Sequence, residues 1–237
     1  MASRIMHLAV ADALADANGF LTGKEAKDRF LFGSLLPDAS ETKASHFPTY
    51  MPEKGGTKIW KTFDLTAFRE RYGEEIRTDP LYLGYYFHLV QDILFRKIMY
   101  GETKYDPHVP GNIPLLYEDY RTVGGWIIRT RKLTLPDIPD GLEKEDKLLG
   151  QFPFRMQAFE EELKKDFQRY GPETDGPGRT HFLHRETAER FITESVELCQ
   201  AEILWLSGVG KDRHLDEQAF CWRAESGSAH NKNKRHR

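Results

Sequence analysis

Hydrophobic residues recur along most of the chain at the three- and four-residue spacing of amphipathic helices, whereas the alternating pattern of strands is almost absent. The first such segment ends at Asn18-Gly19, a typical helix-termination signal. A later one opens with Asp79, which suits an N-cap, and Pro80, which suits the first helical position. The predicted helices span residues 3–17, 23–34, 64–73, 79–99, 114–133, 142–170 and 187–206.

Segments rich in proline and glycine separate these helices, at residues 39–60, 101–113, 134–140 and 171–180. The first is long for a compact domain, and long loops more often carry function than short ones. We therefore predict an all-α fold, a single-domain multi-helix bundle with long functional loops, over residues 1–223. Residues 224–237 are polar and basic without an apolar anchor, which predicts a disordered tail.

The composition limits the possible classes of function but does not identify one. The chain has 237 residues, a formal net charge of −3 and two cysteines, which indicates neither a nucleic-acid or membrane partner nor a disulfide framework. No run of about 18 apolar residues occurs, and the N-terminus lacks the features of a signal peptide. We expect a cytoplasmic protein.

One histidine and one carboxylate interrupt the apolar run GYYFHLVQDILF. His88 and Asp92 are four residues apart and therefore face the same side of the predicted helix, among residues typical of a core. A buried carboxylate is costly unless it is paired or binds a metal. Taken alone, the pair is explained by a hydrogen bond between His88 and Asp92 within the core.

Three further polar residues favour a metal site. His7 lies on the apolar side of the first helix, Asp38 directly follows an apolar segment that ends in Leu-Leu-Pro, and His46 follows in the long loop. Histidine nitrogens and carboxylate oxygens are ligands that Zn²⁺ and similar divalent ions accept. We predict that His7, Asp38, His46, His88 and Asp92 hold one or two such ions, most simply Zn²⁺.

An ion with open coordination positions lowers the pKa of bound water and offsets the charge on a phosphoryl oxygen. The leading hypothesis is a metal-dependent hydrolase in which metal-bound hydroxide attacks phosphorus. Asp38 or Asp92 would orient or deprotonate that water. With no basic groove in view, a small soluble phosphorylated substrate is the first expectation.

These residues resemble those of the zinc-dependent phospholipase C and S1/P1 nuclease superfamily, in particular its short intracellular bacterial branch. The resemblance rests on His7, on FGSLLPD ending at Asp38, on SHF at His46 and on GYYFHLVQD, and it covers roughly the first 130 residues. It implies an all-helical phosphoesterase. Carried over, it implies that Asp38, His46 and His88 hold one zinc ion, that Asp92 bridges, and that His7 helps to hold another.

The chain also departs from that family. No further histidine follows the His-x3-Asp motif, and HFLHRETAERF places its histidines and carboxylates at other spacings, so the resemblance implies one or two ions and not three. Asp119, in LYEDYRTVGGWII, and His184 are weaker candidates for substrate binding. His184 and Glu186 are equally explained by the start of a helix, whose dipole favours an acidic residue.

The sequence also bears on two other functional classes. A helical domain with a structural metal, acting through protein contacts, would use the same ligands with closed coordination. An HD-type phosphohydrolase would carry an adjacent His-Asp pair, and the sequence contains none.

Overall fold

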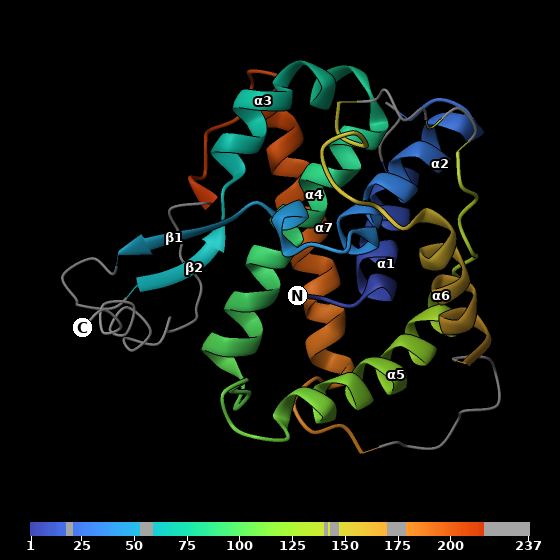
Figure 1. The fold of residues 1–237 in the computed structure, drawn as a ribbon, viewed down its shortest axis with the longest axis vertical. Helices are drawn as coiled ribbons and strands as arrows, with labels where there is room; N and C mark the ends of the chain where they lie inside the picture. The colour runs from blue at the N-terminus through green and yellow to red at the C-terminus, as the bar shows by residue number, and fades with distance from the viewer. Residues whose placement is uncertain (18–20, 53–58, 140–141, 143–146, 170–178, 216–237) are drawn as a thin grey trace, which may run out of the picture.

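The computed structural model describes residues 1–17, 21–52, 59–139, 142, 147–169 and 179–215, and these residues form a mostly helical protein (Figure 1). The α-helices are α1 (Arg4–Ala17), α2 (Lys24–Gly33), α3 (Leu65–Thr78), α4 (Pro80–Arg96), α5 (Asn112–Arg131), α6 (Met156–Arg169) and α7 (Arg185–Leu206). Shorter elements are two 3-10 turns, η1 (Leu36–Ala39) and η2 (Lys43–His46), a π-helical turn η3 (Lys97–Glu102), and strands β1 (Pro48–Pro52) and β2 (Ile59–Phe63).

Helix α4 is the centre of the core. Every residue from Leu81 to Arg96 is buried, and the helix contacts α1, α2, α3 and α7. A helix that is apolar on all sides is expected to be enclosed in this way. Asp79 accepts a hydrogen bond from the backbone N–H of Leu81 at 2.9 Å, which confirms its predicted N-cap role. Because α4 is enclosed and capped, any polar side chain in its middle is held rigidly.

Two glycines let α2 and α4 approach until their backbones touch. A Cβ atom added at Gly33 would lie 2.1 Å from the carbonyl oxygen of Leu81, and one added at Gly84 would lie 2.2 Å from that of Phe30. Only residues without a side chain fit such a crossing. The end of α2 is thereby held against the face of α4 that also carries His88.

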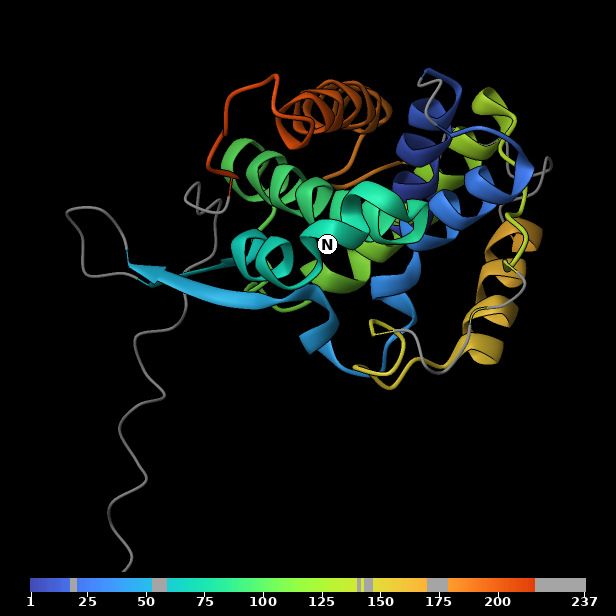
Figure 2. The same ribbon diagram turned by 90° about the horizontal axis from the view of Figure 1, so that it is seen from above.

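A β-hairpin corrects the all-α prediction. Strands β1 and β2 pair antiparallel, with Thr49 opposite Thr62, and extend away from the helices (Figure 2). The first strand lies in the predicted loop 39–60, where Pro48 and Pro52 read as loop residues. Proline is nevertheless compatible with edge strands, because it removes only one donor from the ladder.

Two helix boundaries also differ from those predicted. Helix α3 continues past Gly73 to Thr78, with non-helical dihedral angles at Tyr72 (φ −127°, ψ 20°). Helix α6 begins at Met156 and not at residue 142, since Pro153 disfavours helical dihedral angles in the residue before it. The other predicted helices are confirmed to within a few residues at each end.

The proposed tail, residues 224–237, lies outside the described residues. Among the helices that the structure describes, none is both long enough and apolar enough to cross a lipid bilayer.

Candidate metal centre

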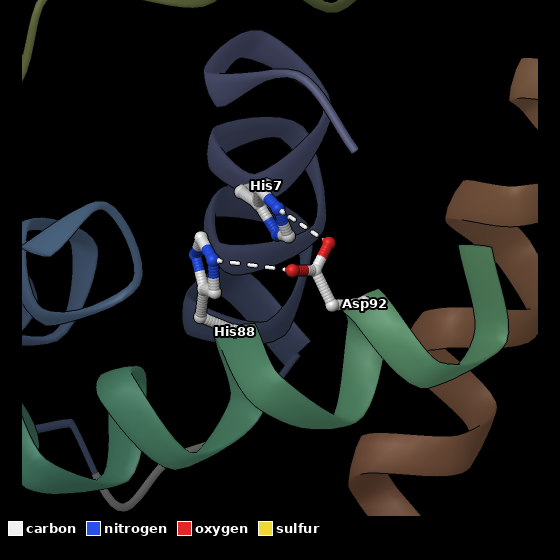
Figure 3. A group of neighbouring side chains, drawn as sticks. All are labelled: His7, His88 and Asp92. Carbon is white, nitrogen blue, oxygen red and sulfur yellow. Dashed lines mark ion pairs between the residues drawn. The ribbon is translucent and has the colours of Figure 1, made fainter. Parts of the chain in front are cut away.

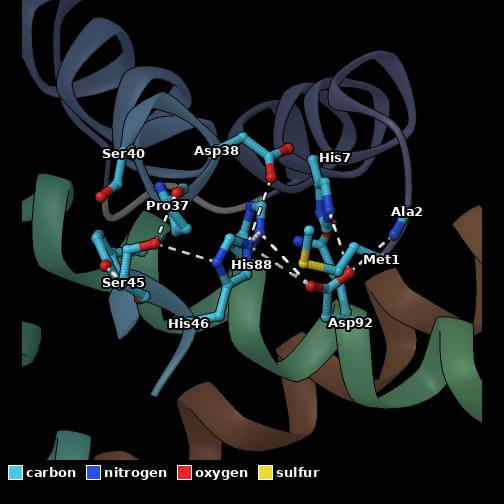
Figure 4. A network of polar contacts seen from close by, with 12 residues as sticks. Met1, Ala2, His7, Pro37, Asp38, Ser40, Ser45, His46, His88 and Asp92 are labelled. Atoms are coloured by element: carbon cyan, nitrogen blue, oxygen red, sulfur yellow. Dashed lines mark hydrogen bonds and ion pairs between the residues drawn. The ribbon is translucent and has the colours of Figure 1, made fainter. Parts of the chain in front are cut away.

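Four elements bring five predicted ligands together. His7 comes from α1, Asp38 from η1, His46 from η2, and His88 and Asp92 from successive turns of α4 (Figure 4). The spacing between His88 and Asp92 follows from the helical repeat of α4, whereas the other three residues are brought to the site by tertiary packing. The structure thus places every predicted ligand at one site.

The ligand atoms form two overlapping groups, within each of which they lie less than 4.8 Å apart. In the first, the Asp92 carboxylate lies beside the two stacked imidazoles, with Oδ1 3.5 Å from His7 Nε2 and Oδ2 3.7 Å from His88 Nε2 (Figure 3). In the second, His46 Nε2 lies 3.4 Å from Asp38 Oδ1 and 3.1 Å from His88 Nε2. His88 belongs to both groups, and Asp92 Oδ2 also lies 3.9 Å from His46 Nε2.

Hydrogen bonds at the outer nitrogens fix the orientation of two rings. His88 Nδ1 lies 2.8 Å from the carbonyl oxygen of Ser34, which can only accept, so this nitrogen carries the proton and Nε2 keeps its lone pair. His7 Nδ1 likewise lies 2.9 Å from Gln91 Oε1. Histidines that bind metals usually donate from the second nitrogen in this way.

The third ring is oriented through a serine. His46 Nδ1 lies 3.1 Å from Ser45 Oγ, and that hydroxyl has carbonyl acceptors at 2.9 Å in Pro37 and Thr42. The serine proton is directed to a carbonyl, so its oxygen accepts from the imidazole. All three Nε2 atoms therefore present lone pairs to the same region.

Two of the predicted ligand atoms, both hydrogen-bond acceptors, are left without a donor in this arrangement. Asp92 Oδ2 and His7 Nε2 are fully buried and have no hydrogen-bond partner, and the rings of His7 and His88 stack with centroids 3.8 Å apart. The 3.7 Å between His88 and Asp92 is too long for the hydrogen bond of the core-pair explanation. Buried acceptors left facing one another are costly, and a bound cation satisfies them, so the residues fit a metal ion.

The protonation states suit metal binding. Burial, together with the neighbouring His7, lowers the pKa of His88 to about 3. Burial alone would raise the pKa of both carboxyl groups, but in Asp38 the neighbouring His46 and His88 outweigh it and lower the pKa to about 2. In Asp92 the N-terminal ammonium group and His7 also outweigh burial, and the pKa lies well below its usual value. Neutral imidazoles and ionised carboxylates are the forms that bind metal ions.

The N-terminal residues Met1 and Ala2 pack against the site. The backbone N–H of Ala2 donates to Asp92 Oδ1 at 2.8 Å, and the hydroxyl of Tyr120 donates to the carbonyl oxygen of Met1 at 2.6 Å. Asp92 is thus held from α4 and from the N-terminal segment at once.

A cavity of about 640 Å³ opens beside the cluster, and Asp38 and His46 line it. His7, His88 and Asp92 are completely buried. The centre therefore has an accessible side formed by Asp38 and His46 and an enclosed side formed by the other three residues.

The weaker candidates lie elsewhere. Asp119 is buried and uses both carboxylate oxygens to accept the backbone N–H groups of residues 181–183, at 2.7 to 2.9 Å, and so holds the segment that leads into α7. His184 is exposed at the N-cap position of α7, and Glu186 lies in the first turn, as the helix-start interpretation predicts.

No protein-family model, curated protein or solved structure matches this chain. The resemblance to zinc-dependent phospholipases C and S1/P1 nucleases stays a prediction, and function has to be argued from the site itself.

Proposed function

We propose that the protein is a metal-dependent phosphoesterase acting on a small phosphorylated substrate. The observation that carries the proposal is the convergence of three Nε2 lone pairs and two carboxylates beside an open cavity, with each Nδ1 already bonded to a protein acceptor. Zn²⁺ is the ion that such nitrogen and oxygen donors favour. A bound ion of this kind lowers the pKa of water and offsets charge on a phosphoryl oxygen.

The residues divide into two roles. His7, His88 and Asp92 are enclosed and rigid, and they are assigned to holding the ion or ions. Asp38 and His46 face the cavity, where a substrate can reach them. A carboxyl group with a pKa of about 2 is a weak base, so Asp38 is assigned to orienting water by accepting its hydrogen bond.

A second function has an observation in its favour. The His7, His88 and Asp92 group is completely buried, and closed coordination by protein ligands is typical of structural metal sites. In that case the ion would stabilise the packing of α1 against α4. The protein would then act through contacts with a partner. Hydrolytic activity separates the two functions.

The first experiment is elemental analysis of the full-length protein, followed by assays with 4-nitrophenyl phosphate and bis(4-nitrophenyl) phosphate. We expect one or two zinc-like ions per chain and hydrolysis that EDTA abolishes and Zn²⁺ restores. His88→Ala and Asp92→Asn should lose metal and activity. His184→Ala is the matched control, since this exposed histidine lies outside the cluster.

Metal that is retained without hydrolysis of either ester would favour the structural function. Absence of metal from the wild-type protein, or full metal content in His88→Ala, would contradict both functions.

A further inference from the structure

Five arginine and lysine side chains line the same cavity as Asp38 and His46. Arg4 is paired with Glu162 and Asp166, and Arg121 lies 4.0 Å from Glu118. Of the other three, two lie one helical turn from a predicted ligand. Lys43 precedes His46 by three residues in the 3-10 turn η2, where such residues share a face. Arg96 follows Asp92 by four residues on α4. Lys61 is the third, on β2.

The Arg96 side chain is fixed in position, and some of its guanidinium N–H groups have no hydrogen-bond acceptor. It is 8% exposed, donates through one terminal nitrogen to the carbonyl oxygen of Lys61 at 3.2 Å, and its Nε is buried without a hydrogen-bond partner. The guanidinium lies 4.2 Å from the ring centroid of Phe63, and that ring lies 6.1 Å from the ring of His46. Phe63 thus neighbours both the cation and the metal centre.

No carboxylate among the described residues lies within ion-pair distance of Lys43, Lys61 or Arg96. The acidic residues elsewhere on the cavity wall, Glu162 and Asp166, each lie 2.7 Å from Arg4. Asp38 is paired with His46.

The positive charges of Arg96 and Lys43 also repel that of Lys61. Burial, with the nearby charges of Arg96 and Lys43, lowers the pKa of Lys61. Like charges held together without a counter-charge destabilise the protein, and an anionic ligand relieves that repulsion.

Another part of the cavity wall is apolar and aromatic. It comprises Tyr100 and Tyr105, whose ring centroids lie 5.5 Å apart, with Ile113, Leu116 and Tyr117 from α5. Such a surface suits a planar or apolar organic group.

We propose that Lys43, Lys61 and Arg96 bind a second anionic group of the substrate. The preferred substrate is then a phosphoester whose aromatic or apolar leaving group carries a further phosphate or carboxylate. This inference rests on the proposed function for the placement of the scissile phosphoryl group at the metal centre, where the ions already offset its charge. The three cations are not among the predicted ligands, and Arg96 packs against Phe63, so they are left to recognise the second anion.

The test compares two non-hydrolysable ligands that differ by one carboxylate, phenylphosphonate and 4-phosphonobenzoate, by calorimetric titration of the full-length protein. The wild type should bind 4-phosphonobenzoate about tenfold more tightly, equivalent to about 1.4 kcal/mol. The ratio of the dissociation constants of the two ligands should approach one in the Lys43→Gln/Lys61→Gln double variant. Lys24→Gln, which removes an exposed lysine paired with Asp28 and Asp137, should keep the wild-type ratio.

The outcomes separate this inference from the proposed function. A ratio near one in the wild type, an unchanged ratio in the double variant, or no binding of either ligand overturns the inference, whatever metal content and hydrolysis show. A lysine-dependent preference in a protein without metal or hydrolysis supports the anion site and contradicts the phosphoesterase.

Discussion

Replacing Gly84 with alanine should damage the candidate metal centre without changing any of its five histidine and aspartate residues. The added Cβ would lie 2.2 Å from the carbonyl oxygen of Phe30 and 2.8 Å from the backbone nitrogen of Ser34. Non-bonded atoms rest about 3.5 Å apart, so α2 and α4 must separate locally by about 1 Å. His88 is one turn from Gly84, and its Nδ1 bond to Ser34 is 2.8 Å long, so the same shift takes this bond beyond hydrogen-bonding distance.

The expected cost follows from these contacts. Overpacking of this kind costs about 1–3 kcal/mol, and the lost hydrogen bond about 1 kcal/mol more. Alanine has the higher helix propensity by about 1 kcal/mol, which leaves a net destabilisation of about 1–3 kcal/mol. Loss of the bond that orients a ligating histidine lowers metal affinity by about 10–100-fold.

Urea unfolding in EDTA measures the stability change, and competition with a chromophoric chelator measures zinc affinity. Gly73→Ala is the control, because a Cβ there meets no atom within 4 Å and should stabilise α3 by about 0.5–1 kcal/mol. Wild-type stability and zinc affinity in Gly84→Ala would refute the link between the glycine crossing and the orientation of His88.

Gln91→Leu should weaken zinc binding by about 10–100-fold in the same chelator competition, because His7 loses its acceptor, and unchanged affinity would contradict that role. Asp119→Ala should destabilise the protein by about 1–3 kcal/mol in urea, since the N–H groups of residues 181–183 lose their acceptor, with metal content unaltered. The folded-state pKa of His88, about 3, lies below its unfolded value of 6.5. The metal-free protein should therefore have its full stability above pH 6.5 and lose up to about 1.4 kcal/mol per pH unit as the pH falls toward 3. Equal urea midpoints at pH 7 and pH 5 would contradict this dependence.

The sequence alone predicted most helices and the histidine and aspartate residues that cluster at the candidate metal centre. Both depend on short-range information: the helical repeat places His88 and Asp92 on one face, and apolar neighbours mark them as inward-facing. Where a local signal was overlooked, as at Pro153, the predicted boundary was wrong. The hairpin was missed because its bounding prolines gave a loop signal.

Only the tertiary structure decided how those histidine and aspartate residues meet. The acceptors that orient the rings of His88 and His7 are 54 and 84 positions away along the chain. Lys43, Lys61 and Arg96 likewise come from a 3-10 turn, a strand and the end of α4. Helical periodicity fixes the direction of a side chain over a turn or two, whereas the distance between separate segments is set by how their side chains and glycines pack.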